Sequence, residues 1–309
     1  MIDFRYHLVS LISVFLALAV GVVLGAGPLQ NSLGTALNDQ VTSLRADRNE
    51  IKTRLEQTEA AVNDRDDYIA AAAAAYLPGT LEGKKVALAV LPEAKSDDID
   101  TIIAQLEAAG GTINGRVSLT TAWTDDSREA FRQTYSGQFA GYLGGAASND
   151  TNAVLGQGLA TALTTSGQNA TALSDLLTAS NTPLMTIDAA PTGPADSLIV
   201  IGPRTTAVPG TASSPAPTEG TTPAAWNSAL GGAASVSPTV VLGAADVSTD
   251  LVAQLRTSKT TVTTVDSIGQ AAAAVSVPLA LVATIAGTHE AYGFDDGADA
   301  VMPPAPSRG

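Results

Sequence analysis

The chain of 309 residues contains no cysteine, which excludes disulfides, thiolate nucleophiles and thiolate metal sites. Other ligands for soft metals are scarce, since there are three methionines, Met1, Met185 and Met302, and two histidines, His7 and His289. Copper(I) prefers thiolate and thioether ligands. A copper site within one soluble domain is therefore hard to assemble from these scattered residues.

Basic residues are also few, because 16 Lys and Arg stand against 30 Asp and Glu, for a net charge of −14. Nucleic acids and anionic lipid surfaces attract clusters of Lys and Arg. The sequence contains no such cluster. We therefore expect no nucleic-acid partner.

Motifs of common enzyme classes are missing as well. No serine lies in a nucleophile elbow, and only His289 could act as its base. The stretch Gly156-Gln157-Gly158 lacks the third glycine of a dinucleotide loop, and residues 201–204 (IGPR) lack the Lys-Ser/Thr ending of a P-loop. The sequence predicts a protein that is not an enzyme and holds no cofactor.

One long apolar run is present near the N-terminus. Residues 8–26 (LVSLISVFLALAVGVVLGA) carry no charge, and a helix of that length covers roughly 28 Å at about 1.5 Å per residue, close to a hydrocarbon core. We assign residues 1–27 to a single transmembrane anchor. Its main apolar side chains are Leu8, Phe15, Leu16, Leu18, Val22 and Leu24.

A cleaved signal peptide and a buried helix of a soluble protein are the alternatives to an anchor. A signal peptide has a basic n-region and an accessible A-x-A-like site, whereas here Asp3 accompanies Arg5 and the A-x-A at 17–19 lies inside the apolar run. The next basic residue after the run is Arg45. The positive-inside rule then predicts a cytoplasmic N-terminus and an extracytoplasmic bulk.

Residues 30–77 are predicted to form a coiled-coil stalk that ends before Pro78-Gly79. Seam positions separated alternately by four and three residues continue for more than four heptads. They are Leu37, Val41, Leu44, Arg48, Ile51, Leu55, Thr58, Val62, Arg65 and Ile69. We expect a homo-oligomer such as a homodimer; the alternative is an amphipathic helix folded back on its own domain.

Residues 80–302 alternate between strand and helix patterns. Residues 86–91 (VALAVL) form the continuous apolar run of a buried parallel strand, acidic residues at 97, 98 and 100 suit the start of a helix, and the next strand covers 112–119. Further strands are expected at 184–187, 198–201, 240–242 and 262–265, and helices at 125–140, 150–163, 169–180, 222–234 and 247–257. This alternation predicts the α/β class, with an open, mostly parallel sheet and flanking helices.

Three segments of this domain need a separate interpretation. Residues 205–223 are rich in Pro, Thr, Ser and Gly, which predicts a flexible loop or a break between two halves of the sheet. Residues 277–286 are apolar but only about half a membrane span long, so we expect a core helix. Residues 303–309 have nothing to bury and are predicted to be a disordered tail.

Paired carboxylates occur at three places, Asp97/Asp98, Asp125/Asp126 and Asp295/Asp296. We interpret the first two pairs as helix-start residues that face solvent. The third pair lies near two other ligating side chains, and a solvated turn is favoured there because the spacing of a calcium loop is absent. The sequence therefore assigns no metal site, and the candidate ligands are His289, Glu290, Asp295 and Asp296.

The N-terminal residues resemble the start of a known family. Residues 4–10 (FRYHLVS) and 14–25 (VFLALAVGVVLG) are similar to the opening of the MctB family, actinobacterial envelope proteins commonly labelled copper transporters. The order of parts also resembles that family: anchor, heptad helix, a strand followed by residues 97–99 (DDI), then 262–267 (VTTVDS), an apolar helix and Tyr292-Gly293.

The resemblance implies a location in a cell membrane, with the outer membrane also suggested for the family, and a part in copper homeostasis or transport. A related protein, SteB, is linked instead to cell separation through a partner, SteA, and to control of peptidoglycan hydrolases. The resemblance thus also implies a non-catalytic coiled-coil scaffold that binds a protein partner in the envelope. Residues 289–293 (HEAYG) depart from members with a His-rich terminal segment, so copper enters through the resemblance alone.

Overall fold

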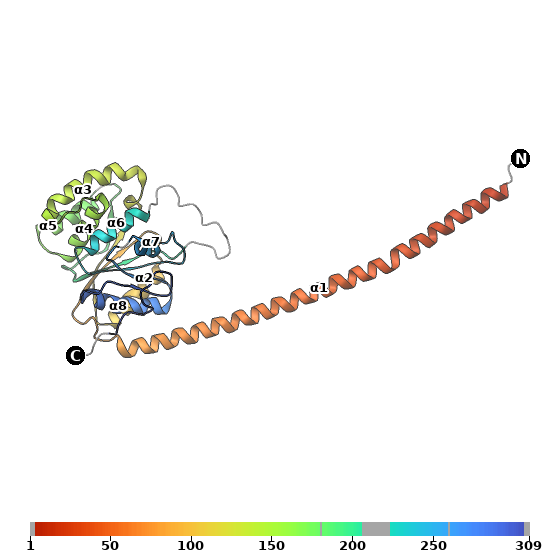
Figure 1. Cartoon of the computed structure of the whole chain (residues 1–309), viewed down its shortest axis with the longest axis horizontal. Coiled ribbons are helices and arrows are strands. Elements are labelled where there is room, and N and C mark those ends of the chain that lie inside the picture. Colours follow the sequence, from red (N-terminus) through yellow and green to blue (C-terminus); the bar gives the residue numbers. More distant parts are fainter. Residues whose placement is uncertain (1–3, 180, 206–222, 259, 306–309) are drawn as a thin grey trace. The chain divides into compact units, whose positions relative to one another are not determined.

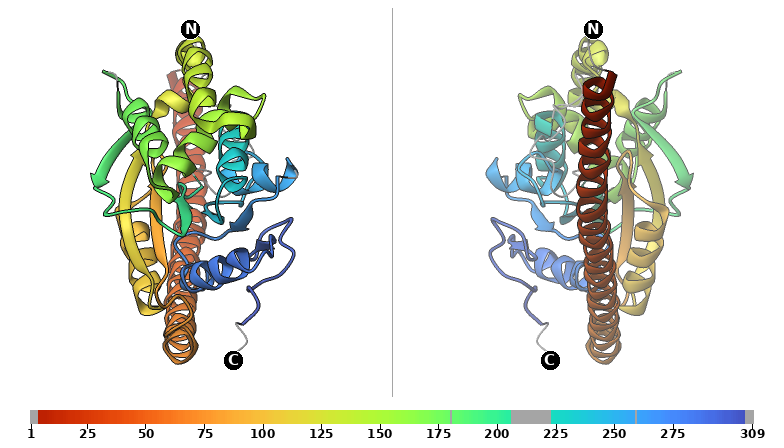
Figure 2. Two further views of the ribbon diagram at one scale, coloured as in Figure 1. Left: turned by 90° about the vertical axis from the view of Figure 1, so that its left-hand side faces the viewer. Right: turned by 90° about the vertical axis from the view of Figure 1, so that its right-hand side faces the viewer.

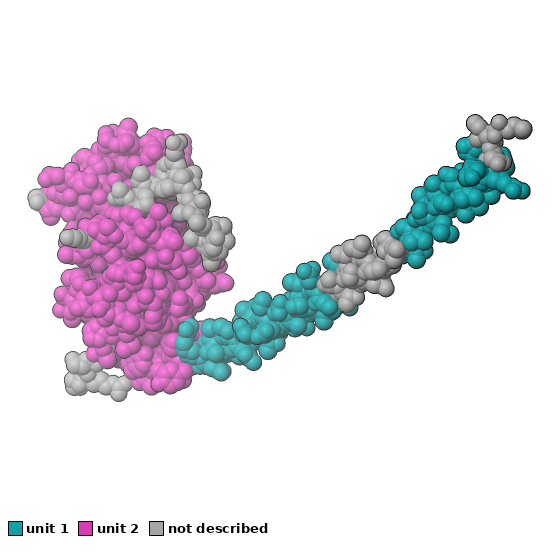
Figure 3. Space-filling view, turned by 45° about the vertical axis from the view of Figure 1, so that its right-hand side comes forward, with its two compact units in different colours: residues 1–65 teal, residues 66–309 magenta. Residues whose placement is uncertain are grey.

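The computed structural model of the chain describes residues 4–179, 181–205, 223–258 and 260–305 (Figure 1). The chain divides into two compact units, residues 1–65 and 66–309, and each is described by itself (Figure 3). The loop predicted at 205–223 and the tail predicted at 303–309 lie mostly outside the described residues.

Helix α1 runs from Phe4 to Tyr76 and makes up the described part of the first unit. It continues through residues 30–34, the polar stretch that separates the predicted anchor from the predicted stalk. The segment Phe4–Val23, with a mean hydropathy of 2.3, is long and apolar enough to cross a membrane. It is 0% buried, whereas the buried helix of a soluble protein, one of the alternatives to an anchor, would be mostly buried.

The second unit is built on a seven-stranded sheet with the strand order β3-β2-β1-β4-β5-β6-β7. Strand β3 is antiparallel to β2, and the other neighbouring strands are parallel. This confirms the predicted α/β class with a mostly parallel sheet. The strands are β1 Lys85–Val90, β2 Thr112–Leu119, β3 Met185–Ala189, β4 Ser197–Ile201, β5 Thr239–Leu242, β6 Thr263–Val265 and β7 Ala291–Tyr292.

Helices cover both faces of the sheet: α3 to α6 lie on one side and α2 and α8 on the other (Figures 1 and 2). Each predicted helix is present, but three begin several residues away from the expected start. The helix expected at 125–140 begins at Glu129, because a 3-10 turn takes residues 126–128. The helix expected at 247–257 begins at Leu251, and the core helix expected at 277–286 begins at Ala271. The helices are α2 Ser96–Ala108, α3 Glu129–Leu143, α4 Thr151–Thr164, α5 Gln168–Thr178, α6 Pro223–Ala234, α7 Leu251–Thr257 and α8 Ala271–Ile285.

The strands send alternate side chains into two cores. Ala87 and Ala89 of β1 face the core under α3 to α6, whereas Val86 and Leu88 face the core under α2 and α8. Because both faces are covered, the inner strands are apolar at nearly every position, as parallel sheets are. Helix α8 is buried along most of its length, which confirms the expected core helix. Ile69, the last predicted seam position, packs partly buried against this second core.

Helices α4 and α6 approach each other at glycines. A Cβ on Gly156 would overlap the backbone of Ala229, and one on Gly232 would overlap the backbone of Ala153. The G-x-G stretch at 156–158, already judged unfit for a dinucleotide, therefore serves helix packing.

The chain order reverses between β1 and β4. Strand β2 lies on one side of β1, whereas β4 to β7 follow on its other side. Strand β5 pairs with β4, so the sheet continues across residues 205–223, where a break between halves was one alternative. In open α/β sheets, ligands bind outside the carboxyl ends of the strands at such a reversal.

Candidate functional site

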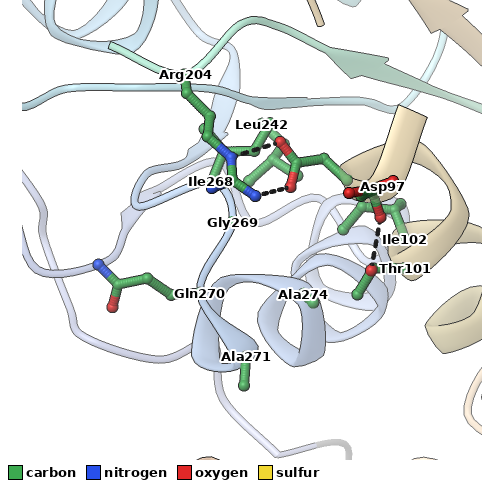
Figure 4. Close-up of a pocket in the computed structure, with 11 residues that line it drawn as sticks. Asp97, Thr101, Ile102, Arg204, Leu242, Ile268, Gly269, Gln270, Ala271 and Ala274 are labelled. Atoms are coloured by element: carbon green, nitrogen blue, oxygen red, sulfur yellow. Dashed lines mark hydrogen bonds and ion pairs between the residues drawn. The ribbon is translucent and has the colours of Figure 1, made fainter. Parts of the chain in front are cut away.

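A pocket of about 230 Å³ lies at the carboxyl edge of the sheet, beside the first turns of α2 and α8 (Figure 4). It combines carboxylate, guanidinium, hydroxyl and amide groups with an apolar wall, and its lining includes no histidine or cysteine. The lining residues are Asp97, Asp98, Thr101, Ile102, Arg204, Leu242, Ile268, Gly269, Gln270, Ala271 and Ala274.

An ion pair between Arg204, which follows β4, and Asp98 of α2 forms one side of the pocket (Figure 4). Arg204 donates from Nε to Oδ2 at 2.8 Å and from Nη2 to Oδ1 at 2.6 Å. This hydrogen bonding raises the pKa of Arg204, so its charge is permanent. The side chain of Asp98 is 5% exposed and that of Arg204 39% exposed.

The solvent-facing interpretation is therefore wrong for Asp98, although Asp97 is exposed as expected. The partner of Asp98, Arg204, lies 106 residues further along the chain, so no local sequence pattern could predict the pair. Gly269 makes room for the pair, because it has a φ of +92° and a Cβ there would overlap the guanidinium of Arg204. The arrangement can hold a small polar ligand by hydrogen bonds, and it offers no nucleophile paired with a base.

A second buried ion pair lies at the carboxyl end of β6. Asp266 is 0% exposed, and its Oδ2 lies 3.0 Å from Nη1 of Arg256, whose side chain is 6% exposed. The same carboxylate accepts from Ser267 Oγ at 2.7 Å, Phe294 N at 2.9 Å and Asp295 N at 3.0 Å. The buried carboxylate thus has one cation and three hydrogen-bond donors around it, as buried charges require.

Arg256 binds the backbone at the end of β7 and in the turn that follows it. It donates to the carbonyl oxygens of Tyr292 at 3.0 Å and Asp296 at 3.1 Å. A Cβ on Gly293, with its φ of +136°, would overlap the Asp266 carboxylate. The pair therefore fixes the turn after β7 to the sheet, and its groups are too fully engaged to act on a substrate.

The candidate metal ligands lie around this turn but do not converge. No group of three or more His, Cys, Asp or Glu side chains in the described part of the chain could hold a metal ion. His289 and Asp296 are exposed, as expected for a solvated turn, whereas Asp295 is half-buried. Its burial, together with the nearby Asp266 and Asp246 carboxylates, raises the pKa of Asp295.

The pair Asp125/Asp126 behaves as expected. Asp125 accepts from the backbone N–H of Ser127 at 2.8 Å and from its hydroxyl at 2.7 Å, which caps a short 3-10 turn. These hydrogen bonds lower the pKa of Asp125. The carboxylate is thus a capping group.

Comparison with known proteins identifies the family. A family model described as "Copper transport outer membrane protein, MctB" matches residues 1–303. The chain belongs to the MctB family. This confirms the resemblance seen in the N-terminal residues.

Curated members of the MctB family match part of the chain. It is 32% identical over 133 residues to "Copper transporter MctB" of Mycobacterium tuberculosis (strain ATCC 25618 / H37Rv). It is 34% identical over 133 residues to the protein of the same name of Mycobacterium leprae (strain TN). Each match covers 43% of this chain and 42% of the relative, so the aligned part spans less than half the length of these relatives.

In this MctB-family chain, the predicted anchor and seam residues share the surface of α1. Leu8, Phe15, Leu16, Leu18 and Val22 are exposed, and Leu24 falls outside the described side chains. The apolar seam residues from Leu37 to Val62 are between 38% and 67% exposed. Arg48, Thr58 and Arg65 are exposed with them.

Sequence reasoning missed Arg204, Arg256 and Asp266 as organising residues. A signal was present for two of them, because Asp266 directly follows the apolar end of a strand and Arg204 comes three residues after another. Polar residues at the carboxyl ends of parallel strands gather at one edge of the sheet. Arg256, within a short helix, carried no such signal.

Proposed function

We propose that this MctB-family chain acts in copper homeostasis or transport as a single-pass membrane protein. The family match over residues 1–303 supports the copper role, together with the names of the curated relatives. The apolar helix segment Phe4–Val23 supports the anchor. The family description makes the outer membrane one location to test, beside the cell membrane.

The proposed arrangement has three parts. Residues 1–27 anchor the chain with its N-terminus in the cytoplasm, because Arg5 precedes the span and Arg45 is the next basic residue. Residues 30–77 form a stalk, and residues 80–302 form an extracytoplasmic domain. We propose no enzymatic activity and no resident cofactor, so copper enters as cargo or signal.

Self-association is part of this proposal. One helix cannot line a channel, so a transport role requires several copies or another membrane protein. The exposed apolar side chains that recur at heptad spacing along α1 support several copies.

The copper role is tested by deleting the gene from its host and measuring growth and cell-associated copper across a copper series. We expect lower copper tolerance, restored by the full chain and not by residues 28–309, which lack the anchor. A zinc series is the control for general envelope damage. Unchanged copper tolerance and copper content in the deletion strain would overturn the copper role.

A second candidate is a non-catalytic scaffold of the SteB type that binds an envelope protein and regulates cell-wall hydrolysis during cell separation. The exposed seam favours it, because a scaffold needs a surface for association and no metal ligand. Chains of unseparated cells in the deletion strain, with unchanged copper tolerance, would favour this candidate. Restoration by the full chain but not by a Leu44→Asp, Ile51→Asp variant would attribute the defect to the stalk.

A further inference from the structure

We infer that the stalk is a parallel, two-stranded coiled coil of two identical chains in exact alignment, and that charges beside the seam select this alignment. The inference rests on the self-association proposed above and names the partner as a second copy. It concerns residues 37–65, since Ile69 packs against the core of the α/β domain.

The spacing of the seam fixes every heptad position. Steps of three residues lead from an a to a d position and steps of four lead from d to a. Val41, Arg48, Leu55 and Val62 are therefore a positions, and Leu37, Leu44, Ile51, Thr58 and Arg65 are d positions. The flanking g positions are Gln40, Asp47, Arg54 and Ala61, and the flanking e positions are Asn38, Arg45, Lys52 and Glu59.

In a parallel coil with the chains aligned, each g residue faces the e residue five positions later in the partner. Asp47 then faces Lys52 of the second copy, and Arg54 faces Glu59 of the second copy. Both pairs have opposite charges, and the twofold symmetry makes each occur twice. No pair of like charges forms between e and g positions of residues 37–65.

Shifting one chain by a heptad destroys this match. Because the two chains are identical, shifts in the two directions give the same arrangement, which places Asp47 opposite Glu59 on one flank of the seam and Arg54 opposite Lys52 on the other. Both contacts are pairs of like charges, which are destabilising. The charges therefore distinguish the aligned parallel coil from the form shifted by one heptad.

Antiparallel coils bring e opposite e and g opposite g. When the two repeats overlap best, Arg45 meets Lys52. A shift of one heptad either way brings Lys52 opposite Lys52 or Arg45 opposite Arg45. In the best-overlapping antiparallel alignment Asp47 also meets Arg54 at the g positions, so this alignment has like and opposite charges in equal number. In the aligned parallel coil, every pair of charged residues at the e and g contacts has opposite signs.

The charged side chains are available for these contacts. Lys52 lies 3.6 Å from Glu56 and Arg54 pairs with Glu50 along the same helix, with all four side chains at least 60% exposed. Exposed pairs of this kind hold side chains weakly, so they can exchange partners. Such flanking charges select orientation, while the apolar seam supplies the affinity.

Two further features bear on this geometry. The aligned coil places Arg48, at an a position, opposite its own copy; this contact of like charges costs stability, and it limits the number of strands, because a long polar side chain reaches solvent more readily from a two-stranded seam than from a larger bundle. The apolar segment Phe4–Val23 lies at the N-terminal end of the same helix. A parallel coil places both apolar segments at one end, where a single membrane can hold them.

Cysteine cross-linking tests the orientation directly, because the chain has no cysteine of its own. Full-length chains with Leu44→Cys, in detergent, should form a disulfide-linked dimer under mild oxidation, since equivalent d residues meet in the aligned coil. Glu50→Cys, at an outward c position, is the matched control and should give little dimer. A mixture of Leu44→Cys and Leu55→Cys chains should give few mixed dimers, whereas the antiparallel coil would favour them.

Charge reversal tests whether the charges at the e and g positions select the aligned parallel coil. Asp47→Lys places a second positive charge opposite Lys52 in both symmetric contacts, so we expect the dissociation constant of the full-length dimer to rise roughly tenfold at low salt. The double variant Asp47→Lys, Lys52→Asp should restore it. Asp39→Lys makes the same charge change at an outward f position and should leave it within about twofold.

The outcomes separate this inference from the function on which it rests. A monomer by sedimentation at all concentrations would overturn both the stalk and its orientation. A dimer that forms mixed disulfides between Leu44→Cys and Leu55→Cys chains, or a larger oligomer, would overturn the parallel two-stranded coil and leave self-association standing. An Asp47→Lys variant that associates as tightly as Asp39→Lys would overturn selection by charge.

Discussion

Asp266 and Arg256 form a 3.0 Å ion pair in which both side chains are almost completely buried. The pair joins α7 to the end of β6 and holds the turn after β7 through hydrogen bonds to its backbone. Removing one member of such a pair leaves the other charge buried without compensation. The stability of the C-terminal part of the sheet should therefore depend on both residues.

Asp266→Asn should destabilise the protein by about 3–5 kcal/mol, because Arg256 would lose its counterion while remaining buried. Urea unfolding of the full chain measures the loss. Asp188→Asn is the matched control, since its pair with Arg116 spans 3.5 Å and is about one-third exposed; it should cost about 1 kcal/mol or less. Equal losses for the two variants would contradict a special role for the buried pair.

Gly156→Ala should cost about 1–3 kcal/mol, because the added methyl group overlaps the backbone of Ala229 on α6 and the two helices must separate. Gly137→Ala in α3 is the control. Its Cβ would meet nothing within 4 Å, and alanine is favoured in helices by about 1 kcal/mol. A Gly156→Ala variant as stable as Gly137→Ala would show that α4 and α6 do not pack as described.

Arg204→Ala should reduce stability at neutral pH by about 1–3 kcal/mol, because Asp98 would stay buried without its bidentate partner. Urea unfolding of the full chain at neutral pH measures the loss. Asp97→Ala, at an exposed neighbour, should change little, and an Arg204→Ala variant as stable as Asp97→Ala would argue against the pair.

Asp295→Asn should raise the thermal midpoint at pH 7. Burial and the neighbouring Asp266 and Asp246 carboxylates raise the pKa of Asp295, so its charged form destabilises the folded state. A raised folded-state pKa means that this cost is present at neutral pH and disappears as the pH falls below the unfolded value of about 3.9. Thermal scans from pH 7 down to pH 4 should show the gain declining, with Asp296→Asn as the exposed control; a constant gain would contradict this cause.

The sequence predicted those features that depend on residues close together along the chain. The apolar run 86–91 supplied an inner strand, β1, because both sheet faces are covered, and the apolar composition of 277–286 placed α8 in the core. It did not predict the partners of Asp98 and Asp266, because these depend on how distant elements meet at one sheet edge. From the sequence, Asp98 has the position of an ordinary acidic residue at the start of a helix. The strand order places Arg204 beside it, and this contact depends on the tertiary fold.

Residues 1–27 should remain in the mature protein as an anchor rather than leave as a signal peptide. The A-x-A at 17–19 lies within the apolar segment Phe4–Val23, where a peptidase that works at the membrane surface has poor access. N-terminal sequencing of the membrane-bound chain should therefore find the segment intact, and alkaline carbonate should not release the chain.

Cysteine labelling tests the orientation of the chain in the membrane. With the cysteine-free chain as background, Asn63→Cys in intact cells should react with an impermeant maleimide and Asp3→Cys should not. Labelling of Asp3→Cys alone would reverse the orientation, and an N-terminus beyond Ala26 would replace the anchor with a signal peptide.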